Sequence, residues 1–383
     1  MALSLPRGRH SHGLRKQAVL EAVRGSYDTT HAAITDRCGP VAGKRQLEDL
    51  VAASAVDIDD FYATRTPQPA TRETLLVLSA DAKGIVMRPD SLREHTRRAA
   101  ARATPVFRTR LSSGEKPHRK RMATLAAVYD TAPAPRRPHD VITVPGGPRS
   151  PDRAPRPGPH AVNIRRTASL AKDPAAVIAA AFAEADARDP THERVWIVLV
   201  DGDPHQIDRI RAEATRHQVG IHIVLDIVHV IEYVWTAAWC FHVTGDPAAE
   251  DWVATRILQI LTGHADQAAD AIAARADAAG LLPEARGGAD AAVRYLRRHL
   301  EYLCYDEALT HGWPIATGLI EGAARHLIAD RLDITGSRWG LAGAEAILTL
   351  CTLISNKDFN SYWNFHIAHE HQRVHPNDYQ LAA

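Results

Sequence analysis

Residues 195–226, VWIVLVDGDPHQIDRIRAEATRHQVGIHIVLD, decide the fold of this chain. The six apolar residues that open this stretch predict a buried strand that ends at Asp201. Pro204 is tolerated in the first turn of the helix that follows, and the run 221–225 predicts a second strand that ends at Asp226. Strand, helix and strand in this order predict a parallel α/β sheet, whose sites lie at the carboxyl ends of the strands.

The sequence before this stretch contains further strand signals. The apolar run 74–80 predicts the first strand, which ends at Asp81. Residues 83–87 are expected to turn into the next strand, and residues 122–130 form another strand candidate. Asp81 and Asp201 are therefore both expected at the carboxyl ends of strands.

Composition and periodicity divide the chain into four parts. We expect a small helical N-terminal region at 1–63, the first part of the core at 71–228 with an Arg/Pro-rich excursion at 131–166, an all-helical insertion at 229–312, and completion of the core with C-terminal helices at 313–383. The predicted class is α/β, with a sheet flanked by helices.

Two interpretations of the N-terminal region remain open. Residues 29–36 followed by 43–55 fit a helix-turn-helix remnant that binds DNA. They also fit a small helical brace packed on the core. The brace is favoured, because only Lys44 and Arg45 would present basic charge to a DNA groove.

Composition is typical of a soluble globular protein, with 45% hydrophobic and 24% charged residues in 383. No apolar window is long enough to predict a membrane span, and the basic start lacks the apolar core of a secretory signal. The four cysteines lie far apart without CxxC or zinc-finger spacing. A reduced, cytoplasmic and nucleoid-associated protein is the expectation.

Positive charge is concentrated in one part of the chain. Residues 91–170 contain 17 Lys or Arg against 5 Asp or Glu, whereas the whole chain sums to +1. Such asymmetry predicts a basic face for a polyanion, with double-stranded DNA as the expected partner. A solvated Arg-rich segment without a ligand is the alternative.

Three acidic residues are the candidate catalytic and metal-binding groups. Asp81 and Asp201 end predicted strands, and Glu321 lies in a predicted helix. Carboxylates suit Mg²⁺ or Mn²⁺, and a pair of such ions can drive in-line attack on a phosphodiester. Each aspartate taken alone is a weak signal, because a strand-end aspartate often caps the next helix.

Several short motifs carry a family resemblance. They are GKRQ at 43–46, VYD at 128–130, VLVDG at 198–202, LDIVH at 225–229, IEGAARHL at 320–327, DRL at 330–332 and TGSRW at 335–339. In this order they resemble bacterial insertion-sequence transposases of the ISKra4 group, in the DDE superfamily.

The resemblance implies an RNase H-like core and metal-dependent transposition of DNA. It implies two ions, with Asp81 bridging them, Asp201 binding one and Glu321 the other. The implied partners are the transposon ends and target DNA, bound by a homo-oligomer. The family has a longer N-terminal DNA-binding region, so residues 1–63 are expected to be a truncated form of it.

Neighbouring residues compete with or assist these three acids. Asp203 fits either a metal ligand or the N-cap before Pro204, and Asp226 is the main rival of Asp201 as second acid. Asp226 and His229 lie on one helical face, which fits either a hydrogen bond at a helix start or a role in the site. Arg325, four residues after Glu321, is expected to contact a phosphate or to orient the carboxylate, with a weak surface ion pair as the alternative.

Candidate DNA contacts lie in two basic motifs. They are Arg119, Lys120, Arg121, Arg338 and Trp339. Trp339 fits either stacking on a base or ordinary core packing.

Other enzyme classes lack their motifs in this chain. The sequence contains no GxxxxGK[ST] phosphate loop, no GxSxG and no HExxH. Three hypotheses therefore remain: a transposase, an RNase H-like nuclease that cuts without joining, and a catalytically dead relic that only binds DNA.

Overall fold

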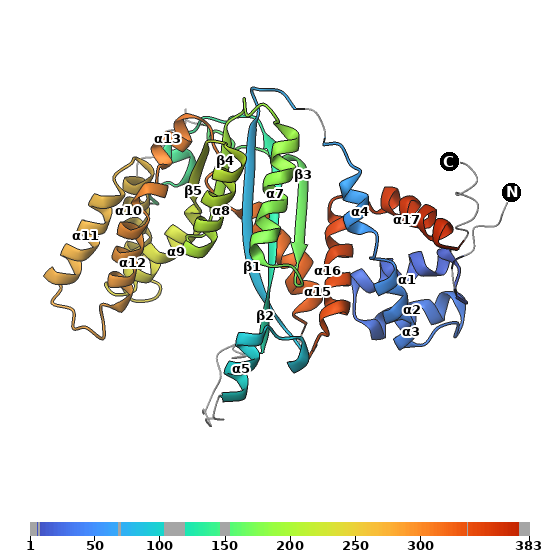
Figure 1. The fold of residues 1–383 in the computed structure, drawn as a ribbon. Helices are drawn as coiled ribbons and strands as arrows, with labels where there is room; N and C mark the ends of the chain where they lie inside the picture. The colour runs from blue at the N-terminus through green and yellow to red at the C-terminus, as the bar shows by residue number, and fades with distance from the viewer. Residues whose placement is uncertain are drawn as a thin grey trace.

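A central five-stranded mixed sheet organises the molecule (Figure 1). The computed structural model describes residue 6 and residues 8–67, 70–102, 119–145, 154–334 and 336–374. The strands are β1 (Leu75–Val86), β2 (Lys120–Thr131), β3 (Val162–Ser169), β4 (Trp196–Val200) and β5 (Ile221–Leu225), in the spatial order β3-β2-β1-β4-β5. β1, β2 and β3 form an antiparallel meander, while β4 pairs parallel to β1, and β5 parallel to β4. The predicted α/β class is confirmed at this level.

The first strand is longer than predicted. Asp81 does not end it, because β1 continues through residues 83–86 and Asp81 pairs with Leu125 of β2. The expected turn at 83–87 is therefore wrong: the antiparallel partner β2 is as long as β1 and pairs with it to the end. Ser79 pairs with Leu199 on the parallel side, so Asp81 reaches the level of Asp201, just beyond the end of β4.

The third strand was missed by the sequence analysis. The excursion predicted at 131–166 ends earlier, because Val162–Ser169 forms β3 at the edge of the sheet. Its first two residues are exposed and the next four, which include Arg165 and Arg166, are half-buried, so its pattern is not that of a buried strand. Within the excursion, the described residues include one short helix, α6 (Pro138–Val141).

Helices cover both faces of the sheet. Alternate residues of β2 point to opposite sides: Ala126 and Val128 join the core that includes α7, and Leu125 and Ala127 join the core that includes α16. The sheet-flanking and C-terminal elements are α7 (Pro174–Arg188), α8 (Pro204–His217), α14 (Gly318–Ala323), the π-helical turn η3 (Ala324–Ala329), α15 (Asp330–Leu332), α16 (Leu341–Ser355) and α17 (Phe359–Val374).

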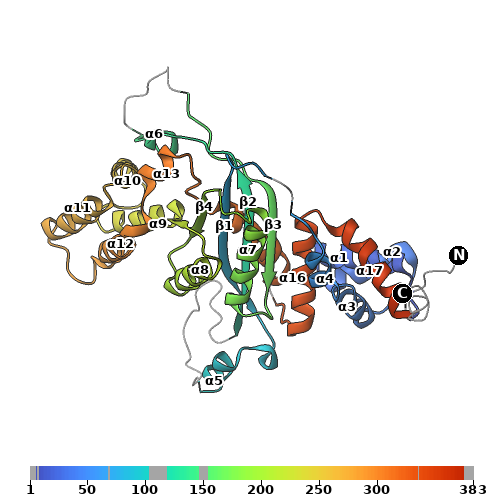
Figure 2. The same ribbon diagram turned by 45° about the horizontal axis from the view of Figure 1, so that its top comes forward.

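An all-helical block lies beyond β5, as predicted for residues 229–312 (Figures 1 and 2). Its elements are α9 (Ile227–Ala238), α10 (Pro247–Leu261), α11 (Ala265–Ala278), α12 (Gly287–Arg298), the 3₁₀ turn η2 (Leu300–Tyr302) and α13 (Tyr305–Thr310). Its apolar side chains are continuous with the core on the α7 side of the sheet. None of the helices in the described ranges is long and apolar enough to cross a lipid bilayer.

Short helices form the N-terminal region on the other side of the sheet. They are α1 (His12–Arg24), α2 (Tyr27–Cys38), α3 (Lys44–Ala53) and α4 (Ile58–Ala63). Ser26 caps α2 by accepting a hydrogen bond from the Thr29 amide. Val19, Leu47 and Phe61 are buried in the core shared with α16, and Lys44 pairs with Asp28. This packing favours the brace over a free DNA-reading helix.

A basic helix follows β1 at the end of the sheet where the parallel strands also end. It is α5 (Glu94–Arg102), which the turn η1 (Pro89–Ser91) precedes. Figure 2 shows α5 projecting from the sheet, clear of the N-terminal helices and of the helical block.

Candidate metal centre

One cavity of about 250 Å³ brings the three predicted acids together. Asp81 comes from β1, Asp201 from the end of β4 and Glu321 from α14. Val228, His229, Glu232 and Thr317 complete much of the wall. No lysine or arginine of the described chain lines this cavity, so nothing in its wall neutralises the carboxylates.

Of these three acids, Asp81 has the pKa that its surroundings change most clearly. Burial raises the pKa of its carboxyl, and the nearby charges of Asp201 and Glu321 raise it further. The Ala82 amide donates a hydrogen bond to Asp81 Oδ1 at 2.6 Å and acts against that shift. Repulsion among these three groups is the electrostatic condition that a bound divalent cation relieves.

The backbone after β4 turns sharply at Gly202, which has φ of +99°. A side chain there would also lie 3.2 Å from the ring of His299, so both conformation and space favour glycine. Asp203 accepts a hydrogen bond from the His205 amide at 2.9 Å and is the N-cap of α8. Asp201 therefore faces the cavity, and Asp203 has the capping role that the sequence left open.

Asp226 is fully buried beneath the cavity. It accepts hydrogen bonds from the Val228 amide at 3.2 Å and the Thr317 amide at 3.1 Å, which joins the start of α9 to the start of α14. Burial raises the pKa of Asp226, although its hydrogen bonds from Thr317 act against that shift. Asp226 thus joins two helices below the acids that line the cavity.

Thr317 lies between two carboxyl groups. Its hydroxyl oxygen is 2.7 Å from Asp226 Oδ2 and 2.8 Å from Glu321 Oε1. One hydroxyl hydrogen satisfies only one of these contacts, so the other requires a proton on a carboxyl group. The raised pKa of Asp226 agrees with such a proton. Thr317 was not predicted as part of the site, although its position four residues before Glu321 places both on one helical face.

A possible ligand set that includes neither Asp81 nor Asp201 shares Glu321. Ligand atoms of Asp226, His229 and Glu321 lie within 4.8 Å of one another. His229 Nδ1 is 3.2 Å from Glu232 Oε2. Glu232 was not predicted as part of the site, because its only signal in the sequence is its place one turn after His229. The acid-rich wall suits Mg²⁺ or Mn²⁺, and an imidazole ligand would favour softer metals.

The helical block supports the Asp201 turn from outside. The Tyr295 hydroxyl of α12 donates a hydrogen bond to the Asp201 carbonyl oxygen at 3.0 Å. The buried His299 ring has Nε2 3.1 Å from the Gly202 carbonyl oxygen and Nδ1 2.8 Å from that of Tyr295. The backbone of the second acid is thus attached to α12, which the sequence did not predict.

Tyr295→Phe should loosen this turn. Without the hydroxyl, the Asp201 carbonyl loses its donor, so amide hydrogen exchange at Gly202 and Asp203 should accelerate by up to about tenfold. Tyr233→Phe is the control, because the Tyr233 ring stacks on Tyr295 at 3.9 Å and stays in place. Equal exchange in the two variants would show that the hydroxyl does not hold the turn.

The other predicted residues lie outside the carboxylate cavity. Arg325 is exposed on η3 and forms no ion pair with Glu321. Arg121 donates to the backbone carbonyl of Leu170 at 2.7 Å, so it connects β2 to the chain after β3. Trp339 donates to the Leu332 carbonyl at 2.8 Å and packs against the Arg331 guanidinium, which is a structural contact. Arg119 and Arg338 are exposed, and Lys120 is half-buried at the start of β2.

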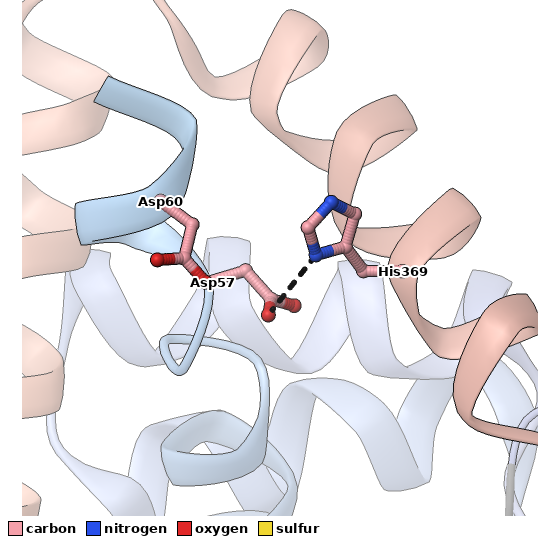
Figure 3. Close-up of side chains that lie close together, drawn as sticks. All are labelled: Asp57, Asp60 and His369. Atoms are coloured by element: carbon pink, nitrogen blue, oxygen red, sulfur yellow. Dashed lines mark ion pairs between the residues drawn. The ribbon is translucent and has the colours of Figure 1, made fainter. Parts of the chain in front are cut away.

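A separate group of possible ligands lies between α4 and α17 (Figure 3). Asp57 Oδ1 is 3.7 Å from His369 Nδ1, and Asp60 lies nearby. The oxygens of the buried Asp57 already contact His366 at 2.5 Å and the Arg373 guanidinium. The positive charge of Arg373 already neutralises Asp57, so the group does not need a metal ion. Its contacts connect the start of α4 to α17.

The carboxylate cavity therefore gathers the three predicted acids, and the ligand atoms that lie within 4.8 Å of one another beside it belong to Asp226, His229 and Glu321. The three acids of the cavity come from a central strand, from the strand parallel to it and from a helix. Among the described residues, no lysine or arginine in the wall pairs with them. All four cysteines are free, and none lines this cavity. Searches against protein-family models and against curated proteins find no match to this chain.

Proposed function

We propose that this chain is a DDE-type DNA transposase, which cuts and joins phosphodiester bonds with two divalent ions. The observation that carries the proposal is the meeting of Asp81, Asp201 and Glu321 in one cavity. The three are separated by more than a hundred residues at each step along the chain, so the tertiary fold, and not local sequence, brings them together.

The sheet topology supports an RNase H-like core. An antiparallel meander of three strands continues into two strands parallel to β1, and two of the acids lie where β1 and β4 are neighbours. The ordered motifs of the ISKra4 group coincide with these elements, since VLVDG spans the end of β4 and IEGAARHL spans α14 and η3. The π-helical turn that begins at Ala324, three residues after Glu321, adds support, because such turns are frequent at functional sites.

The residues of the cavity fit Mg²⁺ or Mn²⁺. Asp81, Asp201 and Glu321 would hold the ions, since oxygen ligands suit hard cations and the wall has no opposing positive charge. When bound, such ions lower the pKa of an attacking water or 3′-hydroxyl and stabilise the leaving oxygen.

The remaining residues position this ligand set. Thr317 holds Glu321 at the start of α14, and the buried Asp226 holds Thr317 through its amide. Tyr295 and His299 fix the turn that presents Asp201. These four are positioning residues, and Asp226 has this role in preference to that of the second acid because it is fully buried.

The reaction of DNA carrying both flanks of the coding sequence tests the proposal. Wild-type protein with Mg²⁺ should nick such a plasmid and produce joined ends, and EDTA should stop both steps. Cutting without joined ends would identify a nuclease. DNA retardation in gels with no metal-dependent product would identify a binding protein without catalysis.

Asp81→Asn should stabilise the metal-free protein. The raised pKa of Asp81 means that the folded chain binds a proton more tightly than the unfolded chain. Metal-free wild type therefore loses stability as the pH rises through that pKa, and the variant lacks this loss. Thermal unfolding at neutral pH without metal should show the variant with the higher melting temperature.

Added Mg²⁺ should reverse that order. At about 100 times its dissociation constant, an ion stabilises the wild type by about 2.7 kcal/mol, and Asp81→Asn should gain much less. Asp208→Asn, an exposed change on α8, should behave as the wild type does. If the melting temperature of the wild type did not change on addition of Mg²⁺ or Mn²⁺, a metal centre in this cavity would be excluded.

A further inference from the structure

A second hollow, of about 710 Å³, opens beside the carboxylate cavity. Asp201 and His229 line both spaces, so the two are neighbours. The far wall of the hollow is α12, which contributes Arg294, Tyr295 and Arg298. A ligand that extends from the acids along this wall therefore meets two arginines.

The two arginines are placed to bind an anion. Arg294 and Arg298 are four residues apart, so they lie on one face of α12, and both are exposed. Among the described residues, no carboxylate lies within ion-pair distance of either one. Other arginines of the same region are paired: Arg297 contacts Asp270 at 2.7 Å, and Arg286 contacts Asp277 at 3.0 Å.

The support behind these arginines is rigid. Tyr295 lies between them in sequence, stacks on Tyr233 of α9 and donates to the Asp201 carbonyl. His299 follows Arg298 directly, and its ring lies beside the Gly202 carbonyl. The wall with the two arginines is thus attached to the backbone of one of the acids, which sets the spacing between the anion site and the carboxylates.

We propose that this hollow binds a backbone phosphate of the DNA strand, next to the phosphodiester held at the carboxylates, through Arg294 and Arg298. The inference rests on the proposed function for the identity of the polyanion. Guanidinium groups suit phosphate because they donate two parallel hydrogen bonds. Asp201 and Asp203 also line the hollow and repel an anion, so the phosphate lies against the two arginines of α12. Binding through phosphate is independent of base sequence.

The salt dependence of DNA binding tests this site. The probe is a fluorescein-labelled, random-sequence duplex, with Ca²⁺ in place of Mg²⁺, and the readout is fluorescence anisotropy. Each phosphate contact contributes about 0.9 to the slope of log affinity against log salt. The double variant Arg294→Ala/Arg298→Ala should therefore lose up to about 1.8 from the slope and bind about tenfold or more weakly at low salt.

Arg297→Ala is the matched control, since Arg297 is on the same helix but binds Asp270. It should keep the wild-type slope. Arg294→Lys/Arg298→Lys should recover most of the slope, because the charge remains. A double alanine variant that is folded, by circular dichroism, and retains the wild-type slope overturns the proposal.

The same proteins separate this inference from the proposed enzyme activity. If the wild type makes no metal-dependent product but the slope falls in the double variant, the phosphate site stands and the transposase proposal fails. If the wild type cuts and joins DNA and the double variant has an unchanged slope, the phosphate site is wrong and the transposase proposal stands.

Discussion

Asp201→Asn should abolish both nicking and joining by the folded protein, with a loss of about a thousandfold or more. A neutral amide in place of this carboxylate weakens the binding of a divalent ion, and loss of several kcal/mol of transition-state stabilisation corresponds to that factor. The backbone of the turn should persist, because Tyr295 and His299 contact carbonyl oxygens and not the side chain. Product formation on the flank-carrying plasmid at saturating Mg²⁺ measures the effect.

The control lies two residues away. Asp203→Asn changes the same charge, and asparagine is an equally good N-cap for α8. This variant should retain most of its activity. If Asp201→Asn were as active as Asp203→Asn, Asp201 would not be a metal ligand, and Asp226, its rival, would be the candidate second acid.

Asp130→Ala should destabilise the protein by about 3–5 kcal/mol, because it leaves the buried Arg194 without its carboxylate partner. Asp130 is 1% exposed at the end of β2, and it contacts Arg194 at 2.7 Å and Arg188 at 3.4 Å. The Asn163 side chain donates a further hydrogen bond at 3.0 Å. This network connects β2, β3, α7 and the start of β4. The free energy of unfolding in urea measures the loss.

An exposed ion pair provides the comparison. Asp28 pairs with Lys44 at 2.6 Å, but both side chains are largely in solvent. Asp28→Ala should therefore cost less than about 1 kcal/mol. A similarly small cost for Asp130→Ala would mean that the buried arginines find other partners or water.

Asp130 and Asp201 show what the local sequence can predict and what it cannot. Asp130 stands in the motif VYD, and Asp201 stands in VLVDG, so both follow apolar runs and look alike in one dimension. In the fold, Asp130 is paired with arginines, whereas Asp201 faces a cavity without any. The motif resemblance identified both positions, and only the surroundings distinguish a structural acid from a candidate ligand.

What the sequence by itself determined is local. The helix α8 and the strands β2, β4 and β5 were predicted close to their observed bounds, because apolar periodicity and capping residues act within a few residues of chain. The concentration of helices between β5 and α14 was predicted on the same basis, and so was the trio of acids as candidates.

Tertiary structure decided what depends on distant partners. Pairing with β2 extended β1 past Asp81, and an edge position allowed β3 to form from an Arg-containing segment. Asp226 is buried between the starts of α9 and α14 and connects them, whereas Asp201 lines the cavity. The arginines of α12 lie near the acids because Tyr295 and His299 of the same region contact the carbonyl oxygens of the Asp201 turn. Strand pairing, burial and charge balance each depend on neighbours that are far away in sequence, so a local sequence pattern cannot predict them.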